Sequence, residues 1–111
     1  FLNEKLDEGK PTILATHVPF YSAVDSTLKE RSIQVRNRIY YWNQEDSSYE
    51  PDDRTQEFIN RIYAEDSNVV QIVAAHLHAS WDGPVTEKLR EHIFAPSFEG
   101  QIGIIYVIPA E

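Results

Sequence analysis

The sequence predicts an α/β fold in which parallel strands of a mixed sheet are joined by a helical crossover. Two short runs of apolar, partly β-branched residues, at positions 12–16 and 69–75, have the composition and length of buried strands. Between them, residues 52–64 carry an apolar stripe at helical spacing behind a candidate cap, Asp52 or Asp53. The order strand, crossover, helix, strand implies that the two strands are parallel neighbours in one sheet.

The two ends of the chain add a helix and a hairpin to this prediction. Residues 1–9 are typical of the end of a helix, because two leucines spaced i,i+4 precede a glycine. Near the other end, residues 92–95 and 101–108 are apolar runs on either side of a turn, which predicts a C-terminal antiparallel hairpin of buried strands. Residues 82–84, Asp-Gly-Pro, predict a further turn. Residues 22–50 show neither a helical nor an alternating pattern, so no element is predicted there.

The composition limits the possible functions. The chain has 111 residues, one domain or part of one, and its hydrophobic fraction of 41% is enough for a core. It has no cysteine, so a metal would need His, Asp, Glu, Asn or backbone oxygen as ligands; this also fits a reducing compartment, and a cytoplasmic location is expected. The formal net charge of −8 disfavours non-specific nucleic-acid binding, and no stretch reaches the ~18 apolar residues of a membrane span. The chain also has no methionine, even at position 1, so we expect it to be part of a longer protein.

Three histidines follow the two predicted parallel strands. His17 comes after the first strand, and His76 and His78 come after the second. Because sites in open sheets lie beyond the carboxyl ends of the strands, His17 and His76 are expected at one edge of the sheet. In extended backbone, residues i and i+2 point the same way, which would place His76 and His78 on one side, ~6–7 Å apart. This separation suits ligands of two metal ions that lie ~3.5–4 Å apart, and the alternative is a surface histidine pair without metal.

These motifs, in this order, resemble the C-terminal half of a calcineurin-like metallophosphoesterase. Residues 16–19, Thr-His-Val-Pro, are similar to the family's strand-end histidine and proline turn. Residues 75–78, Ala-His-Leu-His, are similar to its Gly-His-x-His motif, and residues 92–107 to its closing hairpin. The resemblance implies that residues 1–111 are the C-terminal half of such a domain, with a partial metallophosphoesterase-type sandwich as the fold.

The resemblance also implies a function, a dinuclear metal-dependent phosphoesterase that hydrolyses phosphomonoesters or phosphodiesters. By position, His17 and His76 would ligate one ion and His78 the other, with Mn, Fe or Zn as the two divalent metal ions. The family's Asp-x-His, Gly-Asp and Gly-Asn-His motifs are missing from the chain. We therefore expect the bridging Asp, the Asn ligand and the general acid in a missing N-terminal half. The parent protein would act on a phosphorylated substrate, whereas the fragment alone is expected to be inactive and to bind no metal tightly.

Two other functions remain open at this point. The missing motifs also fit a non-catalytic, phosphoesterase-like interaction domain that has no complete metal site. A third possibility is a module that binds a single metal ion through its histidines. Half of a sandwich would expose an apolar face and a free strand edge, so the isolated fragment is expected to form a homodimer.

Several other side chains have both a functional and a structural interpretation. Phe20 and Tyr21 follow the first histidine and are candidates for a substrate pocket, although core packing is the default for aromatic residues. His92 is interpreted as structural or exposed, and Asp82 as a turn or cap residue. Arg31, Arg36 and Arg38 belong to a basic patch that could meet a substrate phosphate, but a solvated charged face is the simpler interpretation.

Overall fold

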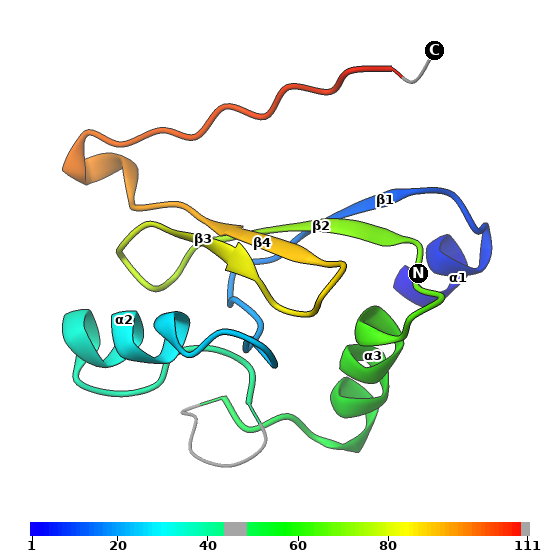
Figure 1. Ribbon diagram of the computed structural model, residues 1–111, viewed down its shortest axis with the longest axis horizontal. Helices are drawn as coiled ribbons and strands as arrows, with labels where there is room; N and C mark the ends of the chain where they lie inside the picture. Colours follow the sequence, from blue (N-terminus) through cyan, green and yellow to red (C-terminus); the bar gives the residue numbers. More distant parts are fainter. Residues whose placement is uncertain (44–48, 110–111) are drawn as a thin grey trace.

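The computed structural model describes residues 1–43 and 49–109 and has a mixed four-stranded sheet at its centre (Figure 1). The strands lie in the order β1-β2-β4-β3, with the bounds β1 (Thr12–Ala15), β2 (Val69–Ala74), β3 (Trp81–Pro84) and β4 (Arg90–Ile93). Strand β2 pairs in parallel with β1 and with β4, and β3 pairs antiparallel with β4. The predicted α/β class, with the first two strands as parallel neighbours, is thereby confirmed.

Helices cover one face of this sheet. Helices α2 (Thr27–Arg36) and α3 (Asp53–Tyr63) lie on the same side of it, and the short helix α1 (Leu2–Asp7) lies beside α3 (Figure 1). Ion pairing and hydrogen bonds from Arg61 to Asp7 and Asn3 join α3 to α1. Helices α1 and α3 match the sequence prediction in position and type.

Helix α2 lies in the region for which the sequence predicted no element. Its apolar side chains do not form one stripe, because Leu28 is buried while Ile33 and Val35 are exposed. Its second buried position is polar: Ser32 donates its hydroxyl proton to the carbonyl of Arg38 at 2.8 Å. A helix held by one leucine and one serine lacks the periodic apolar signal on which sequence prediction depends.

Helix α3 begins behind a side-chain cap, as predicted. The Asp52 carboxylate accepts a hydrogen bond from the Thr55 amide at 2.8 Å, and this bond holds the pKa of Asp52 below its usual value. We expect Asp52→Ala to lower Tm by a few degrees, because an amide of the first turn loses its acceptor. The control Asp66→Ala, in the exposed loop after the helix, should leave Tm unchanged. Thermal unfolding followed by circular dichroism compares the two, and equal shifts in Tm would contradict the capping role.

Buried side chains fill the space between the sheet and the helices in two clusters. The cluster below α3 consists of Leu6, Phe20, Ile59, Ile62, Val69, Ile72, Val85 and Leu89. The cluster below α2 consists of Leu28, Ile39, Tyr41, Ala74, Leu77, Ala79 and Ile93. The cluster below α3 includes Phe20, which follows His17, and the cluster below α2 includes Leu77, which lies between His76 and His78, so the core anchors the loops in which the histidines lie.

The predicted C-terminal hairpin is wrong. Residues 101–109 are extended but form no strand, and they run past the sheet on the side opposite to α2 and α3 (Figure 1). Strand β4 already pairs with β2 on one side and with β3 on the other, so it has no free edge for a returning segment. The segment 101–109 instead exposes its apolar side chains: Ile102, Ile104, Ile105, Tyr106, Val107 and Ile108. The homodimer that the sequence led us to expect stays a prediction.

The antiparallel partner of β4 is a segment that the sequence predicted as a turn. Asp82, Gly83 and Pro84 belong to β3, the edge strand of the sheet. Proline is tolerated in an edge strand, because its missing N–H can face away from the ladder. The side chain of Trp81 packs against the core cluster below α2, as expected for an aromatic residue.

Candidate metal centre

The rings of His17 and His76 meet beyond the carboxyl ends of β1 and β2. The Nδ1 atom of His76 lies 2.9 Å from Nε2 of His17, and the ring centroids are 4.8 Å apart. A hydrogen bond of 3.1 Å from the Ala75 amide to the His17 carbonyl joins the two chain segments there. The prediction that these two histidines share one edge of the sheet is confirmed.

The backbone of His76 and His78 is not extended. Strand β2 ends at Ala74, and the two histidines have φ angles of +58° and +60°, in the left-handed region. Between them, Leu77 is fully buried, and its amide donates to the Ala75 carbonyl at 2.6 Å in a tight turn. The predicted strand-like alternation of His76 and His78 is therefore wrong. Non-glycine residues adopt this conformation at a cost of roughly 1–2 kcal/mol each, and such residues cluster at functional sites.

His78 makes a ring contact different from those of the other two histidines. Its exposed ring packs edge-on against Phe98 in the short 3-10 helix η1 (Ser97–Glu99), with centroids 5.7 Å apart. Within residues 1–43 and 49–109, no three His, Asp or Glu side chains are grouped so that they could hold one metal ion. The described part of the chain therefore brings together a pair of candidate ligands, His17 and His76. The ligand role of all three histidines stays a prediction.

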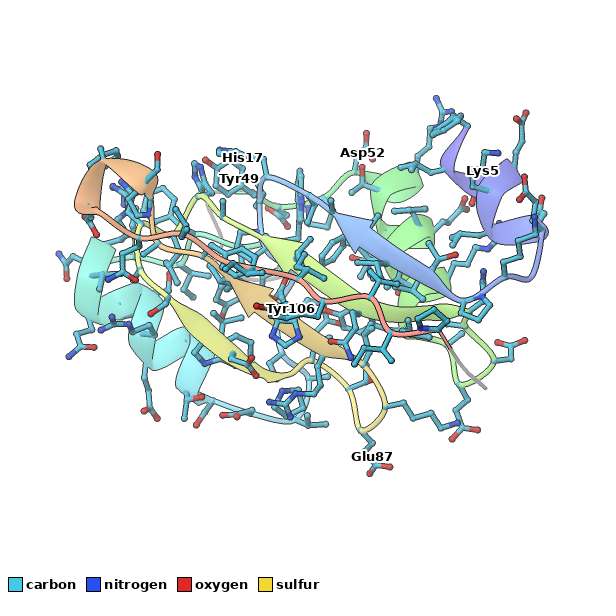
Figure 2. The ribbon with its side chains drawn as sticks, turned by 90° about the horizontal axis from the view of Figure 1, so that it is seen from above. Lys5, His17, Tyr49, Asp52, Glu87 and Tyr106 are labelled. Carbon is cyan, nitrogen blue, oxygen red and sulfur yellow. The ribbon has the colours of Figure 1, made fainter. Side chains whose placement is uncertain are left out.

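The segment between β1 and α3 surrounds His76 with aromatic rings. The hydroxyl of Tyr49 lies 2.6 Å from Nε2 of His76, and the rings of Tyr40 and Tyr49 lie 5.7 and 5.2 Å from the imidazole. Trp42 pairs through backbone bridges with both Phe20 and Tyr49, which ties this segment to the loop after His17. Figure 2 shows His17 and Tyr49 close together at the end of β1.

The protonation of His76 follows from these surroundings. Partial burial is the main cause that lowers the pKa of His76, and the charges of His17, Arg36 and His78 lower it further. The lowered pKa favours the neutral imidazole, the form in which histidine binds metal ions.

The pair also has a spacing that suits a cation. Two nitrogen ligands that are each ~2.0–2.1 Å from one ion lie about 2.9 Å apart when they are neighbours in octahedral coordination. The distance of 2.9 Å between the facing nitrogens of His17 and His76 is close to this value. These two side chains fit two ligand positions of one ion, once both lone pairs turn to the same point.

The two aromatic residues Phe20 and Tyr21 pack against the core, Phe20 buried and Tyr21 half-buried. Phe20 is 4% exposed and belongs to the core cluster below α3. Tyr21 packs against Tyr63 with ring centroids 5.0 Å apart, and burial raises its pKa. Packing accounts for both positions, and a substrate-pocket role for either stays a prediction.

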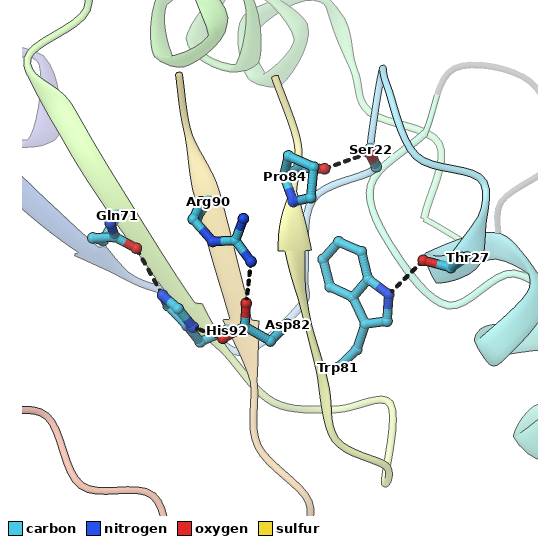
Figure 3. A network of polar contacts seen from close by, with 8 residues as sticks. All are labelled: Ser22, Thr27, Gln71, Trp81, Asp82, Pro84, Arg90 and His92. Carbon is cyan, nitrogen blue, oxygen red and sulfur yellow. Dashed lines mark hydrogen bonds and ion pairs between the residues drawn. The ribbon is translucent and has the colours of Figure 1, made fainter. Parts of the chain in front are cut away.

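A second polar cluster, which the sequence did not reveal, lies on the face of the sheet opposite to the helices (Figure 3). Nδ1 of His92 pairs with the Asp82 carboxylate, and its Nε2 lies 2.7 Å from Oε1 of Gln71. The ion pair with Arg90 and the contact with His92 hold the pKa of Asp82 below its usual value. The prediction of Asp82 as a turn residue is wrong. A hairpin assignment for residues 81–93 would have set Asp82 opposite His92, as their register shows.

This cluster borders a cavity of about 750 Å³ between the sheet and residues 104–106. Apolar side chains, among them Ile13, Val73 and Phe94, form the rest of its wall. The polar atoms of the cluster pair with one another across three strands, so they stabilise the pairing of β2, β4 and β3 on this face.

Fold and site together define a compact α/β protein with a mixed four-stranded sheet and a histidine pair at the ends of its parallel strands. Comparison of the chain with models of known families, with curated proteins and with solved structures found no match. In the part of the chain that the structure describes, none of the helices has the length and apolar character needed to cross a membrane.

Proposed function

We propose that this chain is the C-terminal part of a dinuclear metal-dependent phosphoesterase that hydrolyses phosphomonoesters or phosphodiesters. The observation that carries the proposal is the contact between His17 and His76. Two histidines 59 positions apart in sequence meet at a ligand-like distance of 2.9 Å, beyond the ends of parallel strands. The sequence motifs that contain them follow the order of the metallophosphoesterase pattern.

Three features of the chain support a metal-binding role for this pair. The nitrogen spacing fits two ligands of one ion. His76 is held in a left-handed backbone conformation, a cost that the surrounding contacts must compensate. The hydroxyl of Tyr49 is within hydrogen-bond distance of the second ring nitrogen of His76. Outer-shell partners of metal-binding histidines bond to the same position.

In this proposal His17 and His76 would hold one ion of Mn, Fe or Zn, and His78 would contribute to a second. Divalent ions at such a site polarise a phosphoryl oxygen and lower the pKa of a bound water. The bridging carboxylate, the Asn ligand and the general acid would come from an N-terminal half of the parent protein. The buried side chain of Leu77 anchors the turn between His76 and His78. It thereby determines the backbone positions from which the two imidazole side chains project.

The test is a phosphatase assay on the full-length parent protein, with bis(p-nitrophenyl) phosphate and p-nitrophenyl phosphate as substrates and Mn²⁺ as the metal. We expect metal-dependent turnover, and His76→Ala should reduce kcat at least ~100-fold, because a metal ligand matters more than its outer-shell partners. His92→Ala is the matched control: it removes a histidine that lies outside the pair, and kcat should stay within about threefold.

Two results would contradict the proposal. One is the absence of metal-dependent turnover with either substrate, and the other is a His76→Ala variant that is as active as the wild type. If the parent also lacks an Asp-x-His motif upstream, the non-catalytic interaction domain becomes the better description.

A further inference from the structure

We infer that Arg36 and Tyr49, two described residues between β1 and α3, are positioning residues that hold His76 so that its Nδ1 faces His17. The inference rests on the proposed function, because it concerns the pair that is proposed to bind metal. It assigns a role to a region in which the sequence showed no pattern.

Arg36 fixes the backbone of the turn that contains His76. Its Nε donates to the carbonyl of Leu77 and its Nη2 to the carbonyl of His76, both at 3.2 Å. Since the guanidinium is rigid and planar, two bonds from one fork set the relative orientation of two successive peptide groups. These peptide groups lie within the stretch in which His76 and His78 have positive φ.

Helix α2 ends in a way that places Arg36 for this contact. Arg36 is the last residue of the helix, and Asn37 terminates it in the left-handed conformation, with φ of +56°. The buried Ser32 accepts a hydrogen bond from the Tyr40 amide at 3.0 Å, which folds the chain back along the helix. The ring of Tyr40 then lies 5.3 Å from the guanidinium of Arg36 as a cation–π partner.

Arg36 bonds to main-chain carbonyls, although the chain is rich in carboxylates with which an arginine could pair. The chain has 18 acidic and 10 basic residues, yet no carboxylate of the described residues lies within ion-pair distance of Arg36. Its donors go to main-chain carbonyls that are 40 and 41 positions away in the sequence. A long-range contact of this kind fixes the turn at one geometry, whereas a surface ion pair would leave it free.

Tyr49 sets the orientation of the imidazole. Its hydroxyl lies 2.6 Å from Nε2 of His76, on the side of the ring away from His17. A hydrogen bond at one ring nitrogen determines which nitrogen carries the proton. In the tautomer in which Nε2–H donates to the Tyr49 hydroxyl, the Nδ1 of His76 keeps its lone pair toward the point that it would share with His17.

The first experiment uses the metal-free chain. Amide shifts and three-bond HN–Hα couplings of residues 76–78 are compared by NMR in the wild type and in Arg36→Gln, Arg36→Lys and Arg31→Gln. Arg31 is the matched control, because it lies on the same helix and bonds Gln34 of that helix. We expect both Arg36 variants to change the couplings of His76 and His78, since lysine keeps the charge but lacks the fork. Unchanged couplings in Arg36→Gln, or a wild-type pattern in Arg36→Lys, would overturn the role of Arg36.

The second experiment adds Mn²⁺ and follows the paramagnetic broadening of the histidine ring signals, which detects weak binding. We expect Arg36→Gln and Tyr49→Phe each to raise the apparent Kd for Mn²⁺ by roughly 10–100-fold, and Arg31→Gln to leave it unchanged. A Tyr49→Phe variant with the wild-type Kd and the wild-type His76 tautomer would overturn the role of Tyr49. If Mn²⁺ broadens no ring signal in the wild type, the histidine pair does not bind this ion without the N-terminal half, and the proposed function is decided by the phosphatase assay on the parent protein. The couplings and the tautomer of the metal-free chain then still decide whether Arg36 and Tyr49 position His76.

Discussion

Replacement of Glu91 by Gln is expected to stabilise the protein at neutral and alkaline pH. Glu91 lies on β4 with its side chain toward the helices, and it is 0% exposed. One carboxylate oxygen accepts a hydrogen bond from the Phe20 amide at 2.8 Å, and the other has no hydrogen-bond partner among the described residues. Burial raises the pKa of Glu91 to about 8, although the bond from Phe20 opposes the shift.

The direction of the effect follows from proton binding. In the unfolded chain the carboxyl has its ordinary pKa of 4.5, so between this pH and about 8 only the folded state holds the proton. The folded state therefore binds more protons, and the free energy of unfolding falls as the pH rises, by ~1.4 kcal/mol per pH unit. At pH 7 the loss relative to acidic pH is about 3 kcal/mol. Glutamine keeps an acceptor for the Phe20 amide and carries no charge, so this loss disappears.

Urea unfolding at a series of pH values from 5 to 9 measures this effect. The stability of the wild type should fall across the series more steeply than that of Glu91→Gln, and the difference should be largest above pH 8. Glu87→Gln is the control, because Glu87 is exposed in the loop between β3 and β4. Parallel pH profiles of the wild type and Glu91→Gln would show that Glu91 is ionised in the folded state at a normal pH.

Truncation of Leu77 to Ala is expected to reduce stability by about 2–5 kcal/mol, the range for large-to-small changes in a packed core. The Leu77 side chain is 0% exposed and packs in the cluster below α2. It also lies between the two histidines with positive φ, so its anchoring opposes relaxation of the turn. The variant should therefore lose stability and, in addition, alter the environment of His76.

Ile72→Ala separates these two effects. Ile72 is equally buried, but it lies within β2, where hydrogen bonds to both neighbouring strands hold the backbone. Both variants should lower the midpoint of urea unfolding by similar amounts. Only Leu77→Ala should shift the NMR signals of His76 and His78, and equal shifts in both variants would show that the turn does not depend on Leu77.

The sequence was sufficient for elements whose pattern is local. Helix α3 has a cap and an apolar stripe, and β2 is an apolar run of suitable length, so both were predicted at nearly their observed bounds. Helix α2 was missed because Ser32 occupies a buried position that periodicity assigns to an apolar residue. Strand β3 was missed because Asp-Gly-Pro has turn composition, and only its pairing with β4 at the sheet edge makes it a strand.

For residues 101–109 the sequence predicted a strand that does not form. Their apolar composition predicted a buried strand, but strand formation also needs a partner edge, and both edges of β4 are occupied. Composition reports what a segment can do in a sheet and carries no information about which edges are free.

The candidate site, like the fold, was predicted from the sequence only in part. The positions of His17 and His76 after two parallel strands were enough to predict that they meet, because parallel strands end at one edge. The contacts of Arg36 and Tyr49 with the turn had no sequence signal. They join residues 27 to 41 positions apart through a helix end and a loop without periodicity.

The sequence by itself determined the α/β class, the parallel pairing of β1 and β2 and the meeting of His17 with His76, because these depend on short patterns and on the direction of the strands. Only the tertiary structure decided the left-handed turn at residues 76–78, the burial of Glu91 and the lack of a strand pairing for residues 101–109 within the described chain. Each of these depends on groups that are distant in sequence. The turn depends on the guanidinium of Arg36, the state of Glu91 on its apolar surroundings, and the position of residues 101–109 on the edges of β4, which are already hydrogen-bonded.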